Sequence, residues 1–109
     1  MSKRINIESV LPLWEKHGLK VARNLCLDRE TNDACLLGAL YAENRPHDES
    51  TFILTGVAVK MLVEMGYTRE YATGLHRGFD SDLGPWGEDH DPEGYEDGQK
   101  VASLVFKRS

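Results

Sequence analysis

The sequence predicts an all-α fold, a compact bundle of about five helices, with room for a short extended segment near 19–27. Three observations favour this prediction. The 109 residues suit a single helical domain spanning 1–109 rather than two domains. A hydrophobic share of 40% and a charged share of 28% are sufficient for one core. Apolar residues recur mostly at helical spacing, between residues that commonly begin and end helices.

The first part of the chain combines one clear helix with one ambiguous segment. We expect a helix over about 9–17, because Pro12 fits a first turn and Gly18 suits the position just past a helix end. The apolar residues of 19–27 suit a strand and a helix equally well. Residues 28–32 are polar and predict a loop.

Two further helices are predicted in the middle of the chain. One covers about 34–43, with Asn32 or Asp33 as its cap, and it ends before Pro46. The next covers about 50–65. Its side chains are apolar nearly all round, which is typical of a buried helix, so we expect it to be the central one.

The last two predicted helices have good start signals. The fourth covers about 69–79 and begins after Thr68, a suitable cap. The fifth begins at Asp91 and Pro92, which supply a capping side chain and a proline in the first helical position. It should reach about Phe106.

Small residues recur at four-residue spacing in three of these helices: Gly74 and Gly78, Gly94 and Gly98, and Ala34, Gly38 and Ala42. Residues four apart share a helix face. Glycine inside a helix costs about 1 kcal/mol relative to alanine, so a compensating contact is expected. The spacing predicts that the fourth and fifth helices cross closely at their glycines, against the small residues of the second.

The negative charge of the chain is concentrated in one segment. Residues 1–79 contain ten acids and ten bases, whereas 80–97 contain eight acids and no Lys or Arg. Phosphate groups would be repelled by this segment, so direct nucleic-acid binding is not expected. The segment instead predicts docking onto a basic surface of a larger protein.

Trp86 lies inside the acidic loop 80–91 and is a candidate apolar anchor for that interface. The alternative is that it covers the edge of the core. The candidate partner-binding residues are Asp80, Asp82, Trp86, Glu88, Asp89 and Glu93. If the basic surface normally holds nucleic acid, the chain would act as an inhibitor by mimicry.

Several short motifs of the chain form a recognisable pattern. They are Asp33-Ala34-Cys35-Leu36-Leu37-Gly38-Ala39-Leu40, Tyr71 with Gly74, Gly78-Phe79-Asp80, and Gly94-Tyr95-Glu96-Asp97-Gly98. This pattern resembles one in small uncharacterised bacterial and phage proteins. The resemblance implies no activity. It implies an origin in a phage or accessory gene, where small proteins often act by binding larger ones.

The acidic loop also matches part of a calcium-binding loop. Asp80, Asp82 and Asp91 occupy positions 1, 3 and 12 of a twelve-residue stretch, but Gly84 and Pro85 stand where a ligand and the turn glycine are needed. A small divalent-metal-binding protein is therefore an alternative reading, and we assign no metal and no cofactor.

The remaining candidate chemistry involves cysteine and histidine. Cys26 and Cys35 lie in apolar contexts and are expected to be core residues, without the further Cys or His that zinc requires. A disulfide between them is possible, but the sequence does not suggest it. His76 could face Cys26, Cys35 or an acid and act as a base, but no nucleophile motif accompanies it. We therefore predict a non-enzymatic binding protein, with an enzyme of unrecognised site as the alternative. The sequence contains no apolar run suited to a signal peptide or a membrane span, so a cytoplasmic location is expected.

Overall fold

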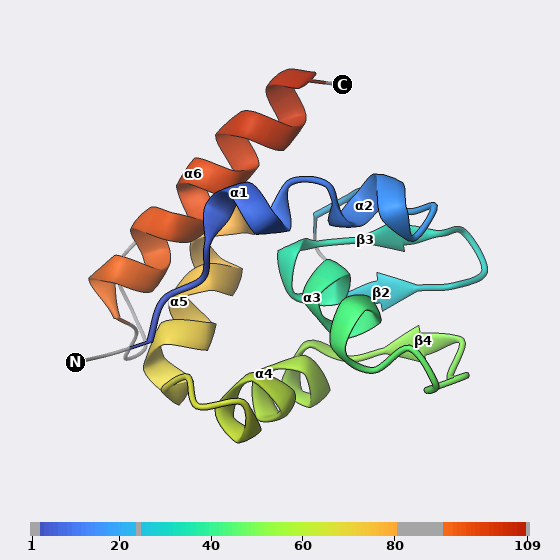
Figure 1. Ribbon diagram of the computed structural model, residues 1–109, viewed down its shortest axis with the longest axis horizontal. Coiled ribbons are helices and arrows are strands. Elements are labelled where there is room, and N and C mark those ends of the chain that lie inside the picture. The colour runs from blue at the N-terminus through green and yellow to red at the C-terminus, as the bar shows by residue number, and fades with distance from the viewer. Residues whose placement is uncertain (1–2, 24, 81–90, 109) are drawn as a thin grey trace.

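The computed structural model describes residues 3–23, 25–80 and 91–108, and these residues form a mixed α/β fold (Figure 1). Within the described residues there are six helices and four strands of two residues each. The prediction of an all-α fold is therefore wrong. None of the described helices is long and apolar enough to cross a membrane.

The strands form one small mixed sheet in the order β1-β3-β2-β4. They are β1 (Lys20–Val21), β2 (Leu27–Asp28), β3 (Asp33–Ala34) and β4 (Phe52–Ile53). Strands β1 and β3 run parallel, whereas β2 is antiparallel to both β3 and β4. The extended segment expected near 19–27 thus contributes β1 and the first residue of β2.

The sequence did not predict this sheet, because a strand of two residues is too short to show an alternation of apolar and polar side chains. Local turn chemistry produces the β2–β3 hairpin instead. The carboxylate of Asp28 accepts the backbone N–H of Glu30 at 2.9 Å, and Asn32 adopts a left-handed conformation with φ of 60°. Asn32 is therefore a turn residue and not the cap of the next helix.

The predicted helix over 9–17 is two short helices, α1 (Ile7–Val10) and α2 (Leu13–Lys16). Pro12 ends the first, because it has no N–H to continue the ladder, and stands directly before the second. The predicted end is confirmed, since Gly18 has φ of 66°.

The central helix is α3 (Leu36–Asn44), which lies between the sheet and helices α5 and α6 (Figure 1). All of its residues from 36 to 42 are buried. Helix α4 (Thr55–Glu64), predicted to be central, buries only one face and leaves Val57 44% exposed. Its predicted first residues instead form β4, with Phe52 facing solvent.

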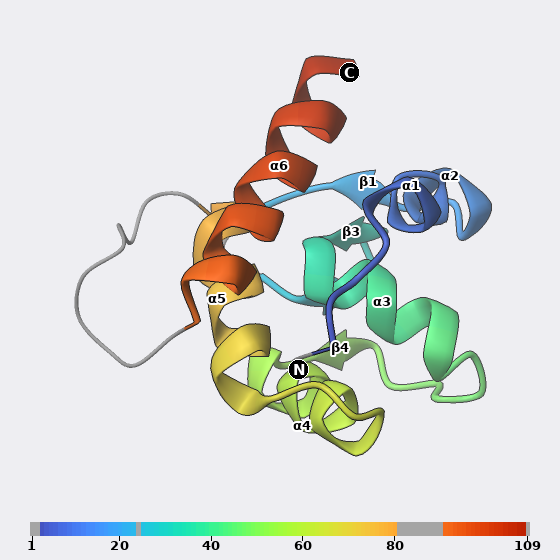
Figure 2. The same cartoon turned by 60° about the vertical axis from the view of Figure 1, so that its left-hand side comes forward.

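Helices α5 (Arg69–Asp80) and α6 (Pro92–Arg108) lie side by side in both views (Figures 1 and 2). Both predicted caps are confirmed. The hydroxyl of Thr68 accepts the N–H of Tyr71 at 3.0 Å, and Asp91 accepts the N–H of Glu93 at 2.9 Å. The two start signals read from the sequence therefore act as expected.

The close crossing of α5 and α6 at their glycines is also confirmed. A Cβ atom on Gly78 would lie 2.1 Å from the carbonyl oxygen of Tyr95, and one on Gly98 would lie 2.4 Å from that of Leu75. Gly74 and Gly94 are equally constrained by the facing backbone. Only glycine permits this approach, which offsets its intrinsic cost in a helix.

The small-residue stripe of α3 has a different partner from the one predicted. A Cβ on Gly38 would lie 1.7 Å from the carbonyl oxygen of Cys26, in the segment that leads into β2. Gly38 therefore lets the hairpin pack directly on the first turn of α3. This contact brings the two cysteines of the chain together.

Candidate functional site

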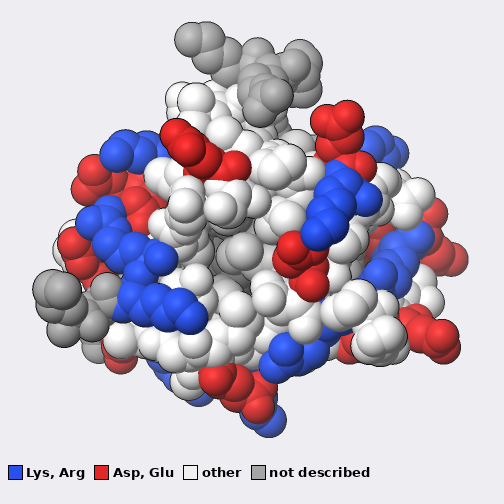
Figure 3. Space-filling model, in the orientation of Figure 1, with Lys and Arg blue, Asp and Glu red and all other residues white. Residues whose placement is uncertain are grey.

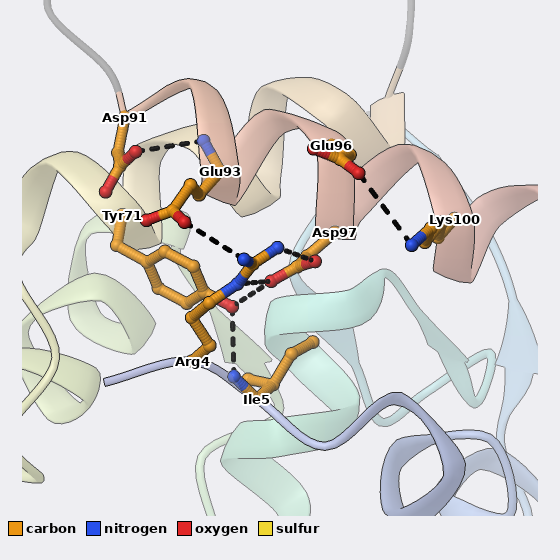
Figure 4. A network of polar contacts seen from close by, with 8 residues as sticks. All are labelled: Arg4, Ile5, Tyr71, Asp91, Glu93, Glu96, Asp97 and Lys100. Atoms are coloured by element: carbon orange, nitrogen blue, oxygen red, sulfur yellow. Dashed lines mark hydrogen bonds and ion pairs between the residues drawn. The ribbon is translucent and has the colours of Figure 1, made fainter. Parts of the chain in front are cut away.

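Two clusters of polar side chains include residues of α5, and each contains a buried carboxylate, Asp97 in one and Asp80 in the other. The first, which we call the anchor cluster, consists of Arg4, Tyr71, Glu93 and Asp97 (Figure 4). Arg4 contacts both carboxylate oxygens of Asp97, with Nε 3.0 Å from Oδ2 and Nη2 2.7 Å from Oδ1. Its Nη1 lies 3.0 Å from a carboxylate oxygen of Glu93. Such two-pronged pairing is the strongest form of ion pair available to arginine.

Tyr71 completes the anchor cluster. Its hydroxyl donates to Asp97 Oδ2 at 2.6 Å and accepts the backbone N–H of Ile5 at 2.9 Å. Burial disfavours the charged form of Asp97, but hydrogen bonds from Arg4 and Tyr71 outweigh it and lower the pKa of Asp97. The side chains satisfy one another, so the cluster serves to fasten the N-terminal segment onto α5 and α6.

The second, which we call the thiol cluster, consists of Cys26, Cys35, His76 and Asp80. Cys26 precedes β2, and Cys35 follows β3 and caps α3. The β2–β3 register pairs Leu27 with Ala34, and beyond it the N–H of Cys35 donates to the carbonyl of Cys26 at 2.9 Å. Both cysteines are free and only 1% exposed.

The hairpin register places Cys26 and Cys35 opposite each other. Residues opposite each other in an antiparallel ladder have Cα atoms about 4.5–5.5 Å apart, and a disulfide spans Cα separations of roughly 4.4–6.8 Å. The two thiols are close enough for each to shift the pKa of the other. This backbone pairing is therefore compatible with a disulfide between the two cysteines.

Helix α5 supplies the other half of the thiol cluster. His76 and Asp80 are one turn apart, and Nδ1 of His76 lies 3.5 Å from Oδ2 of Asp80. This distance is long for a hydrogen bond. Among the described residues, Nδ1 of His76 is a buried nitrogen without a hydrogen-bond partner. Asp80 itself is 2% exposed.

The electrostatics of the thiol cluster separate its two cysteines. Hydrogen bonds from Cys26, from His76 and from the backbone of Gly38 lower the pKa of Cys35, against the opposing effect of burial. The same thiol–thiol hydrogen bond, together with burial, raises the pKa of Cys26. Hydrogen bonding to Cys35 and the nearby charge of Asp80 raise the pKa of His76. These effects make Cys35 the more acidic of the two thiols and Cys26 the less acidic one.

Of the candidate partner-binding residues, Asp80 and Glu93 lie within the described residues. Asp80 is buried beside His76, which does not fit a place on an exposed docking surface. Glu93 is engaged with Arg4. Asp82, Trp86, Glu88 and Asp89 lie outside the described residues. On the face seen in Figure 3, acidic and basic side chains are intermixed around an uncharged middle.

The described part of the chain contains nothing that supports the hypothesis of calcium binding. Asp91 is occupied as the cap of α6, and Asp80 faces His76. Across residues 3–23, 25–80 and 91–108, no group of three His, Cys, Asp or Glu side chains is placed to hold a metal ion.

No protein-family model, curated protein or solved structure matches the chain. No function is therefore carried over from a relative, and the resemblance to small bacterial and phage proteins stays a prediction. The thiol cluster was visible in the sequence only in part. The expectation that His76 could face a cysteine or an acid is confirmed, since it contacts both Cys35 and Asp80. The juxtaposition of the two cysteines was not predicted, because an extended segment was considered only for 19–27, beside Cys26, and the residues around Cys35 were expected to be helical.

Proposed function

We propose that this chain is a thiol-based redox protein in which Cys35 is the reactive thiolate and Cys26 the resolving thiol. One observation carries the proposal: the hairpin holds Cys26 opposite Cys35, and His76 of α5, with Asp80 one turn away, is close enough to lower the pKa of Cys35. A cysteine that serves only as a core residue needs neither an imidazole nor a second thiol.

The chemistry of this arrangement is a two-electron oxidation by a hydroperoxide. The Cys35 thiolate attacks the O–O bond of the hydroperoxide and becomes a sulfenic acid, while the departing alkoxide takes a proton from His76 and leaves as an alcohol. The Cys26 thiol then attacks the Cys35 sulfur. The S–S bond forms, the S–O bond breaks, and hydroxide leaves with the Cys26 proton as water. A small-molecule dithiol restores the two thiols by exchange.

The burial of both cysteines limits the size of the oxidant that can reach them. Both cysteines are 1% exposed, so a folded protein disulfide has no direct route to either sulfur. A small oxidant such as hydrogen peroxide needs far less room. The proposal is therefore a peroxide-responsive dithiol rather than a general disulfide exchanger.

Mass spectrometry of the folded, reduced chain treated with hydrogen peroxide tests this function. After the treated chain is unfolded in denaturant, we expect loss of two hydrogens, protection of both cysteines from alkylation, and one peptide pair joined through Cys26 and Cys35. In Cys26→Ser, a sulfenic acid should accumulate at Cys35 and be trapped by dimedone added with the denaturant. In Cys35→Ser, the remaining Cys26 should stay reduced, because burial and the nearby charge of Asp80 still disfavour its thiolate.

Two results would overturn the proposal. One is a folded chain that keeps two alkylatable thiols at peroxide concentrations that oxidise free glutathione. The other is equal reactivity of Cys26 and Cys35 in the two single variants, since the geometry assigns them different roles.

A further inference from the structure

An open groove lies between the N-terminal helices α1 and α2, strand β1 and the last turns of α6. Its volume is about 590 Å³, which falls within the range of roughly 300–1,000 Å³ typical of ligand sites. It takes no part in the thiol cluster. The apolar side chains that line it are Leu11, Trp14, Leu19, Val21 and Val105.

The floor of the groove is rigid. The Trp14 indole is buried, donates from Nε1 to the carbonyl of Ala34 at 2.9 Å, and stacks on Phe79 with ring centroids 5.9 Å apart. Leu11 and Leu19 are only half-buried, so apolar surface stays open to solvent beside the indole. A fixed apolar floor is what an inserted side chain requires.

The rim of the groove carries negative charge. Glu8 and Glu15 line it, and both are exposed. Among the described side chains, neither forms an ion pair. The nearby bases Lys16 and His17 are engaged elsewhere, each with an oxygen of Glu43, at 2.8 and 2.9 Å.

We infer that this groove docks an apolar side chain of a partner protein that is flanked by Lys or Arg. The apolar floor takes the anchor, and Glu8 and Glu15 pair with the flanking bases. A second copy of this chain is a poor occupant, because each copy has a net charge of −5. The inference depends on none of the residues of the thiol cluster, so it can fail or hold independently of the proposed function.

The probe is a helical peptide of leucine and lysine, compared with the same peptide carrying glutamate in place of lysine. NMR spectra of the labelled full chain should show shifts at the methyl groups of Leu11, Leu19, Val21 and Val105 with the lysine peptide. The glutamate peptide should leave them unchanged. Affinity for the lysine peptide should fall as salt rises.

Matched variants separate the groove from general attraction between opposite charges. The double variant Glu8→Gln, Glu15→Gln should weaken binding roughly fivefold. The control Glu30→Gln, Glu49→Gln removes the same charge from exposed positions outside the groove and should have little effect. Leu19→Ala should also weaken binding, whereas Leu104→Ala, at an exposed position outside the groove, should not.

Three outcomes would overturn the inference. Equal binding of the two peptides would remove the role of charge. Equal losses in the groove and control charge variants would make the attraction non-specific. Concentration-dependent self-association that shifts the same methyl groups without peptide would assign the groove to a second copy of the chain.

Discussion

Residues of helix α5 take part in two polar clusters, each with a buried carboxylate, that are built on opposite principles. In the anchor cluster, Asp97 is bound by Arg4 and Tyr71, and each contact is short and well directed. In the thiol cluster, His76 lies 3.5 Å from Asp80 and keeps a buried nitrogen without a hydrogen-bond partner among the described residues. One cluster is saturated with hydrogen bonds and the other retains capacity for proton transfer.

This contrast indicates which of the two clusters is suited to chemistry. A saturated buried network stabilises one conformation and has no group left to react. A buried polar group that lacks a partner costs free energy, so its presence calls for a reason other than stability. The thiol cluster meets that description, and the anchor cluster does not. The two should therefore respond differently to substitution.

The largest effect should come from the helix pair that supports both clusters. Gly78→Ala places a Cβ 2.1 Å from a backbone oxygen of α6, and this overlap cannot be relieved by a side-chain rotation. We expect a loss of about 3 kcal/mol in the free energy of unfolding, measured by urea denaturation.

Gly56→Ala is the matched control for that substitution. Gly56 lies in α4 with no atom within 4 Å of its added Cβ, so alanine should stabilise the chain by up to about 1 kcal/mol. Equal stabilities of the two variants would show that α5 and α6 do not cross at Gly78.

Breaking the anchor cluster should have the next largest effect. Asp97→Ala leaves the buried hydroxyl of Tyr71 without its acceptor and separates the N-terminal segment from α6. We expect a loss of about 2 kcal/mol. Glu96→Ala, which removes only an exposed pair with Lys100, should change stability by less than about 0.5 kcal/mol. If Asp97→Ala were as mild as this control, the cluster would not fasten the segment.

The pH dependence of stability should single out Asp97. Its pKa is lower in the folded chain than in the unfolded chain, where aspartate titrates near about 3.9. Its contribution is therefore fully present above about pH 4 and is lost as the pH falls through the folded pKa. Asp97→Asn should be less stable at neutral pH and should lose less stability on acidification. Parallel curves for the two proteins would contradict this assignment.

The sequence predicted the two helices that support the anchor cluster, but not the contacts of Arg4 and Tyr71 with Asp97 within it. Helix-start signals and glycine spacing were sufficient to place α5 and α6, because both follow from local backbone chemistry. The meeting of Cys26 with Cys35 depends on a hairpin of two-residue strands, which has no periodic signal. It also depends on Gly38, whose missing side chain admits the carbonyl of Cys26. This contact is apparent only in the folded chain. Because of it, a cysteine that was expected to be only a core residue becomes a candidate reactive residue.

The smallest change in stability, and the most specific one, should follow from His76→Gln. The glutamine cannot carry a positive charge beside Cys35, so the pKa of the Cys35 thiol should rise by about one unit or more. Stability should change by less than about 1 kcal/mol, because the imidazole is not saturated with hydrogen bonds. Thiolate ultraviolet absorbance across a pH series measures the shift without requiring a reagent to reach the buried sulfur. His17→Gln is the control, since His17 pairs with Glu43 away from the cysteines and its loss should leave the thiol titration unchanged. A Cys35 titration that is the same in the parent and in His76→Gln would show that the imidazole does not act on the thiol, and the contrast between the two clusters would then be one of packing alone.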